Sequence, residues 1–231
     1  MIPNMYKIAG EMLPCVIHVA ARSLATHALS IFGDHQDIYA TRQTGFCMLA
    51  SSNVEEAGNL AAVAHLSAIE GSLPFLHFYD GFRTSHELNT VNILNDANIK
   101  NMFDMNLVNK YKDRILNVGN NIQSGLAQNE DIYFQTMEAR NKAYNDMVEI
   151  VVKNMNKVND ILGTNYAPFE YYGSPKASDI IIVMGSASDT TKMVVDNLNH
   201  NGYETGMISV HLYRPFSKEY LKKVIEKLFD K

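Results

Sequence analysis

The chain is poor in cysteine: only Cys15 and Cys47 occur among 231 residues, and both lie in apolar surroundings. Two isolated cysteines cannot frame a disulfide-rich secreted scaffold, a zinc site or an iron–sulfur cluster. We therefore expect two buried thiols that act as small hydrophobes, in a protein of a reducing, cytoplasmic compartment.

Basic runs and long apolar runs are missing too. The net charge is −5, and no Lys/Arg run of the kind that follows phosphates occurs, so we expect no nucleic-acid partner. No stretch reaches the roughly 18 apolar residues of a membrane span, so we expect no membrane partner. Lys7 and Glu11 interrupt the first apolar run, so we expect no signal peptide there. With 46% apolar and 19% charged residues, the composition is that of a globular protein.

Helical and strand-like patterns alternate over residues 1–88. Apolar spacing predicts helices over 1–13, 23–32 and 54–71, and strands over 15–20, 46–50 and 73–79. Pro3 suits a first helical turn, Gly33 suits the residue after a helix, and Asn53 with Glu56 resembles a capping box. Strands separated by helices predict a parallel sheet covered on both faces.

The pattern changes over residues 89–177, where asparagine is frequent and apolar runs are sparse. We interpret this part as a connecting region with one long amphipathic helix over 139–162, ended by Gly163. Disorder is the lesser alternative. The tract 171–175 is a candidate boundary.

A second α/β unit is predicted over residues 178–231. The apolar run 180–184 is typical of a central parallel strand, and the turn 185–189 leads into a helix that ends at His200. A strand over 207–212 and a last helix capped by Ser217 complete it. The turn could hold a phosphate, but it matches neither a dinucleotide fingerprint nor a P-loop, so we favour a plain strand-to-helix turn.

Four of the eight histidines lie in apolar segments: His18, His65, His77 and His211. Such histidines are more often hydrogen-bonded core residues than ligands. His35 differs, because it lies in the polar segment 34–37 between Asp34 and Asp37, where an imidazole beside a carboxylate can carry a proton. A solvated loop held by Asx-type hydrogen bonds is the alternative.

Arg22 is the sharpest single candidate. It directly follows the strand predicted over 15–20, so it should emerge at the carboxyl end of a parallel strand, where ligands of open α/β sheets gather. A guanidinium there can bind a carboxylate or a phosphate through two hydrogen bonds. A surface ion pair is the equal alternative. Arg42 and Arg83 share this ambiguity. These patterns alone predict an α/β protein without assigning an activity.

Several longer motifs carry a resemblance. They are Met1–Pro14, His27–Tyr39, Arg42–Phe46, Phe78–Glu87 and Leu212–Phe216. In this order they resemble the N-terminal third of the pyruvate:ferredoxin (flavodoxin) oxidoreductases. The resemblance covers nearly the whole chain and is weakest between about residues 100 and 172.

The resemblance implies a fold. Residues 1–88 would be an incomplete pyrimidine-type thiamine-diphosphate-binding domain, and residues 178–231 the start of a domain like the C-terminal domain of transketolases. The implied activity is the thiamine-dependent oxidative decarboxylation of pyruvate to acetyl-CoA. The implied partners are coenzyme A, ferredoxin or flavodoxin, and a second copy in a homodimer.

The residues carried over are few. Arg22 matches the family arginine that holds the substrate carboxylate, and the segment with Asp34 and His35 falls near an active-site loop of transketolase-like enzymes. The family's Tyr-Pro-Ile-Thr-Pro segment and its thiamine-activating glutamate should precede Met1. The domains that hold the diphosphate with Mg²⁺ and the iron–sulfur clusters are not recognised here either. The resemblance thus implies a chain truncated at both ends, inactive alone, with no catalytic residue or metal ligand of its own.

Two alternatives stay open. One is a non-catalytic remnant or interaction module of the same fold, which the missing glutamate and metal-binding domain would fit. The other is a related oxidoreductase that uses a different 2-oxoacid.

Overall fold

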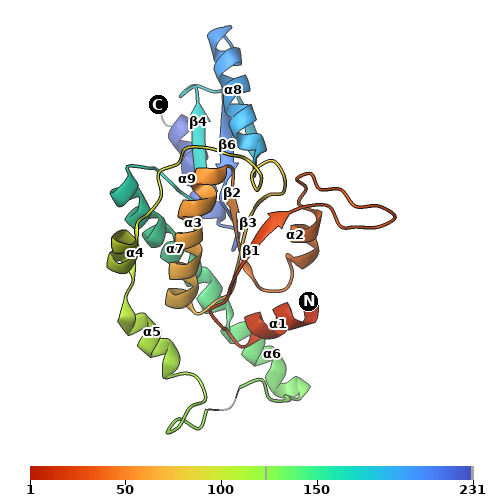
Figure 1. Cartoon of the computed structure of the whole chain (residues 1–231), viewed down its shortest axis with the longest axis vertical. Coiled ribbons are helices and arrows are strands. Elements are labelled where there is room, and N and C mark those ends of the chain that lie inside the picture. Colours follow the sequence, from red (N-terminus) through yellow and green to blue (C-terminus); the bar gives the residue numbers. More distant parts are fainter. Residues whose placement is uncertain (123, 230–231) are drawn as a thin grey trace.

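The computed structural model describes residues 1–122 and 124–229 (Figure 1). The helices and strands follow one another as α1 (Ile2–Gly10), β1 (Val16–Ala21), α2 (Gln36–Thr41), β2 (Cys47–Ser51), α3 (Val54–Gly71), β3 (Phe75–Asp80), α4 (Asp96–Met102), α5 (Met105–Lys112), α6 (Glu130–Ala139), α7 (Asn141–Leu162), β4 (Phe169–Gly173), β5 (Asp179–Val183), α8 (Ala187–His200), β6 (Thr205–Val210), β7 (Leu212–Arg214) and α9 (Lys218–Phe229). The predicted α/β fold is confirmed.

The first sheet has the strand order β1-β3-β2-β7. β1 and β2 both run parallel to β3, and β7 pairs antiparallel with β2. Side chains alternate between its two faces, so Cys47, Leu49 and Phe75 pack toward α3 and α7, whereas Met48 and Phe78 pack toward α1 and α2. The prediction of a parallel sheet covered on both faces is therefore confirmed.

Local signals explain where α3 begins and where α7 ends. The Asn53 side chain accepts a hydrogen bond from the Glu56 amide at 3.0 Å, which caps α3. The Glu56 carboxylate reaches back to the Ser52 amide at 2.6 Å, one residue earlier than in a standard capping box. α7 ends at Gly163, which has the left-handed conformation that suits glycine (φ 71°). The apolar side of α7 packs against α3, and this pairing forms much of the core.

The second sheet has the order β4-β6-β5, with β5 parallel and β4 antiparallel to β6. After β6 the chain passes through His211 into β7, so one continuous segment joins the two sheets. The division of the chain at residues 88 and 177 stays a prediction; β4 lies before the second limit although it pairs with β6.

Two local predictions are wrong, and a third is only partly right. Residues 23–32 form a loop that projects from the molecule between β1 and α2 (Figure 1), because Leu24, Leu29 and Phe32 find no core and stay exposed. The polar segment 34–37 has the Asx-type hydrogen bond that the alternative expected, from the Gln36 amide to the Asp34 side chain at 2.8 Å, but its second half belongs to α2 and not to a loop. The apolar run 180–184 supplies an edge strand instead of a central one, and Ile182 in it is 58% exposed.

Within residues 1–122 and 124–229, none of the helices combines the length and the apolar character that a membrane span requires.

Candidate functional site

The carboxyl ends of β1 and β3 form one edge of the first sheet. Arg22 directly follows β1, and Asp80 is the last residue of β3. Because the strands are parallel and in register, these residues lie at the same edge. Gly81 allows their close approach, since a Cβ atom there would lie 2.5 Å from Cγ of Arg22. The structure thus places Arg22 at the predicted edge, half-buried against the next strand.

The Arg22 side chain is held by backbone oxygens. Its Nε donates to the carbonyl of Ile31 at 2.9 Å, and Nη1 donates to that of Ala20 at 3.3 Å. The amide of Arg22 donates to the Asp37 carboxylate at 3.0 Å, which fixes the start of the loop. A guanidinium has five N–H groups, and among the described residues two of those of Arg22 are used in these bonds, so three remain available.

His35 and Asp80 form a dyad at this edge. His35 Nε2 lies 2.7 Å from Asp80 Oδ1, and the imidazole packs edge-on against Phe78 of β3. The carboxylate fixes the orientation of the ring, and the proton on Nε2 in the neutral form leaves Nδ1 as an acceptor. The arrangement can hold or transfer one proton.

The second unit reaches the same carboxylate. Asp80 Oδ2 accepts hydrogen bonds from the amide of Ser186 at 3.0 Å and from its hydroxyl at 2.5 Å. Gly185 has a φ of +77°, and a Cβ atom there would lie 2.9 Å from Asp80 Oδ1 and 3.0 Å from His35 Nε2. Glycine is therefore required both by the backbone and by the contact.

The surroundings of Asp80 favour its charged carboxylate form. Burial alone would raise the pKa of Asp80, but the hydrogen bonds from His35 and Ser186 outweigh it and hold the pKa below its ordinary value. The carboxylate also lies at the N-terminal end of α8, where a negative charge is stabilised. The turn predicted as a possible phosphate site thus already binds a protein anion.

Sequence reasoning missed Asp80 as the partner of His35, and Ser186 as the partner of Asp80. The available signal was the Asp80-Gly81 pair at the end of a buried strand, the same position that singled out Arg22. Of the other candidates, Asp34 is exposed and starts α2, while Arg83 is exposed at the edge. Arg42 donates to the carbonyl of Tyr39 at 2.8 Å on the surface.

The four histidines of the apolar segments divide into two pairs. His77 and His211 are fully buried, as predicted, but His18 and His65 are exposed, so the prediction is wrong for them. Burial lowers the pKa of His77 to about 3. For His211, burial lowers the pKa, but the Glu56 carboxylate 3.3 Å away raises it more.

The cofactor implied by the resemblance needs a metal-bound diphosphate. Within the described ranges, no three or more His, Cys, Asp or Glu side chains converge as metal ligands. At the sheet edge, the guanidinium of Arg22 is the kind of group that binds a carboxylate through paired hydrogen bonds.

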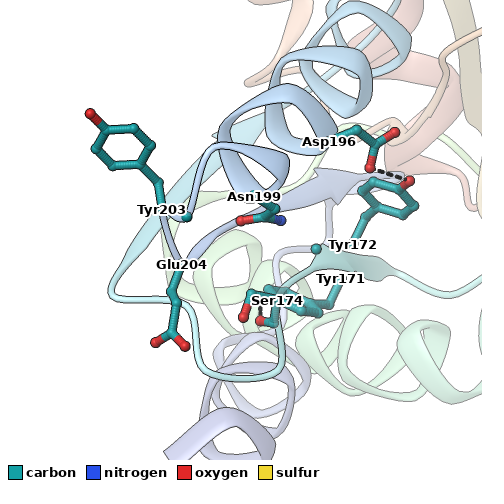
Figure 2. Close-up of a pocket in the computed structure, with 9 residues that line it drawn as sticks. Tyr171, Tyr172, Ser174, Asp196, Asn199, Tyr203 and Glu204 are labelled. Carbon is teal, nitrogen blue, oxygen red and sulfur yellow. Dashed lines mark hydrogen bonds between the residues drawn. The ribbon is translucent and has the colours of Figure 1, made fainter.

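An open groove of about 770 Å³ lies elsewhere, between β4, the end of α8 and the start of β6 (Figure 2). Several of its polar side chains already have hydrogen-bond partners within the chain. Tyr172 donates to Asp196 at 2.7 Å, and the Asn199 side chain bonds the backbone of Thr205. The parallel strands β5 and β6 begin at this side, whereas ligands of such sheets gather where strands end. The groove is therefore a weaker candidate than the Arg22 edge.

Two families match the chain. "Pyruvate flavodoxin/ferredoxin oxidoreductase, thiamine diP-bdg" matches residues 1–157, and "Pyruvate:ferredoxin oxidoreductase core domain II" matches residues 177–229. The first match alone covers more than half of the chain.

Individual relatives agree. The pyruvate-flavodoxin oxidoreductase of Enterobacter agglomerans is 49% identical over 227 residues, which are 98% of this chain and 19% of that protein. The pyruvate:ferredoxin oxidoreductase of Moorella thermoacetica is 48% identical over 225 residues, 97% of this chain and 19% of that protein. This chain therefore spans about a fifth of the length of these relatives.

One solved structure shows the same fold. The 2-oxoglutarate:ferredoxin oxidoreductase of Magnetococcus marinus superposes with a TM-score of 0.56 at 13% identity, over 96% of this chain and 42% of that chain. On the strength of the family matches and the close relatives, this chain belongs to the pyruvate flavodoxin/ferredoxin oxidoreductase family.

Proposed function

We propose that the chain is a segment of a pyruvate:ferredoxin/flavodoxin oxidoreductase and that its part in the reaction is to hold the substrate carboxylate. The observation that carries this proposal is the position of Arg22 at the carboxyl end of β1, at the same sheet edge where β3 ends in Asp80, the partner of His35. A guanidinium suits the planar carboxylate of a 2-oxoacid through two parallel hydrogen bonds.

In the complete enzyme, pyruvate loses CO₂ and its acetyl group passes to coenzyme A. This oxidation releases two electrons, which pass to ferredoxin or flavodoxin through iron–sulfur clusters in other domains. Thiamine diphosphate, held with Mg²⁺ by other domains, supplies the carbon chemistry when bound. Arg22 of this chain binds and orients the carboxylate, and His35, oriented by Asp80, holds or transfers a proton at its Nδ1.

The proposal also includes the oligomeric state and the domain division that the family resemblance implies. The complete enzyme is a homodimer, and the chain divides into the thiamine-type domain (1–88), the connecting region (89–177) and the transketolase-like domain (178–231). A cytoplasmic location stays a prediction.

The test uses the complete enzyme with Arg22→Ala. A charge-assisted hydrogen bond contributes roughly 1.5–3 kcal/mol, so we expect the KM for pyruvate to rise by about an order of magnitude or more. Arg83→Ala is the matched control, because that arginine is exposed at the same edge. An unchanged KM in Arg22→Ala would remove Arg22 from the site.

Turnover tests the alternatives. Pyruvate-dependent dye reduction by this chain together with the other domains of the enzyme would exclude a non-catalytic module of the same fold, and its absence would favour that module. Faster turnover with another 2-oxoacid would reassign the substrate.

A further inference from the structure

Three histidines form a hydrogen-bonded chain on the α3 side of the first sheet. His18 on β1 and His77 on β3 are neighbours in register, and their Nδ1 atoms lie 2.9 Å apart. His18 Nε2 lies 3.1 Å from Nε2 of His65 on α3. At the inner end, His77 Nε2 lies 2.8 Å from the hydroxyl of Ser51. The chain thus runs from a buried serine to two exposed imidazoles.

The proton arrangement of this chain has a chemical consequence. If His77 Nε2 donates to Ser51, then His77 Nδ1 is an acceptor and can receive the proton of His18 Nδ1. His18 then carries its free lone pair on Nε2, the atom that faces His65. A metal-bound histidine commonly donates its other N–H to a fixed acceptor in this way, which orients the ring.

The spacing of the two exposed nitrogens suits one metal ion. Two imidazole nitrogens bound at 2.0–2.1 Å to a tetrahedral ion would lie about 3.3 Å apart. The Nε2 atoms of His18 and His65 are 3.1 Å apart, and their rings are tilted by 43°. In this hydrogen bond His65 Nε2 is the donor to His18 Nε2; once the His65 proton is carried on Nδ1 instead, a rotation of the exposed His65 ring turns both Nε2 lone pairs toward a common point in solvent.

We infer that His18 and His65 form a two-histidine site for a divalent transition metal such as Zn²⁺, Ni²⁺ or Cu²⁺, with His77 and Ser51 behind it as orienting groups. Imidazole nitrogens favour these ions, whereas Mg²⁺ and Ca²⁺ prefer oxygen ligands. Because no three-ligand group occurs in the described parts of the chain, water completes the coordination. A bound ion would join the edge strand β1 to α3.

Titration of the chain with NiCl₂ in a non-coordinating buffer, followed by calorimetry, tests this inference. We expect His18→Gln and His65→Gln each to remove the same site, with at least a tenfold loss of affinity. The double variant should lose one site and not two, because the two residues hold one ion. Ser51→Ala should weaken binding by about tenfold through the orienting chain. His27→Gln, a change at an exposed loop histidine, is the matched control and should leave the site intact.

A melting curve provides a second readout, since an ion that binds only the folded chain raises Tm in the wild type and not in His65→Gln. If His18→Gln fails to fold, His65→Gln decides, because its side chain is exposed on α3. Two results would overturn the inference: unchanged nickel binding in His65→Gln, or the loss of two independent sites in the double variant.

Discussion

β2 and β5 are both short, mostly apolar strands, but the structure treats them differently. All five residues of β2 are buried, because β2 lies between β3 and β7 and has helices on both faces. β5 pairs with β6 alone, and its residues are exposed or only partly buried. An apolar run therefore indicates a strand whose side chains can be buried. Whether they are buried within this chain depends on the strands and helices that lie beside it.

The largest expected effect tests this contrast directly. Leu49 of β2 is fully buried, so Leu49→Ala should lower the free energy of unfolding by about 2–5 kcal/mol. Ile182 of β5 is 58% exposed, and Ile182→Ala should change it by no more than about 0.5 kcal/mol. Urea unfolding of the chain measures both values. Equal losses would show that β5 is as well packed as β2.

The next effect concerns the carboxylate that joins the two sheets. Asp80→Asn removes the charge from the hydrogen bonds with His35 and Ser186, and we expect a loss of about 1.5–3 kcal/mol at pH 7. The folded state lowers the pKa of Asp80, so its contribution is present above the ordinary pKa of an aspartate and is lost as the pH falls through the folded value.

The difference between the wild type and Asp80→Asn should accordingly shrink in unfolding measurements made well below pH 4. Asp146→Asn is the control, because that carboxylate belongs to an exposed surface pair with Lys142 and should matter little at either pH. A difference that does not depend on pH would mean that the charge of Asp80 is unimportant.

The contrast between β2 and β5 also shows which features could be predicted from sequence: those set by nearby residues could, and those set by distant neighbours could not. The three parallel strands β1, β2 and β3, α3 with its Asn53 cap and α7 with its Gly163 end depend on signals within a few residues, and the sequence predicts them correctly. Arg22 could be placed at the sheet edge for the same reason, since a strand end is a local feature. The sequence does not predict β7, because its pairing with β2 joins segments that are far apart in the chain.

The rest depends on partners that are distant in sequence. Asp80 is 45 residues from His35 and 106 residues from Ser186, so no spacing pattern connects them. Residues 23–32 have the apolar spacing of a helix, but no other part of the fold covers their apolar side chains. Because most helices in proteins are stabilised by packing against the core, this segment stays a loop. The edge position of β5 likewise depends on which strands lie beside it.

A smaller effect on stability is expected from removing a helix cap, either that of α3 beside the first sheet or that of α9 beside the second. Asn53 caps α3 with a 3.0 Å hydrogen bond, and Asn53→Ala should lower the free energy of unfolding by about 1 kcal/mol. Ser217 caps α9 with a longer bond of 3.3 Å to the Tyr220 amide, so Ser217→Ala should cost less. Thermal unfolding of both variants measures the order, and a larger loss in Ser217→Ala would contradict it.

The smallest effect on stability should be that of Ile182→Lys, within about 0.5 kcal/mol, but this change should alter how the chain associates. β5 lies at the edge of its sheet and exposes Ile181 and Ile182, and an apolar edge strand promotes pairing between copies. Light scattering should therefore show less self-association in Ile182→Lys than in the wild type. Met193→Lys replaces an apolar residue of α8 that is 73% exposed and should leave association unchanged, because a helix offers no unpaired strand edge. If both lysines reduced association equally, general surface hydrophobicity would explain it, and the open edge of β5 would not be the cause.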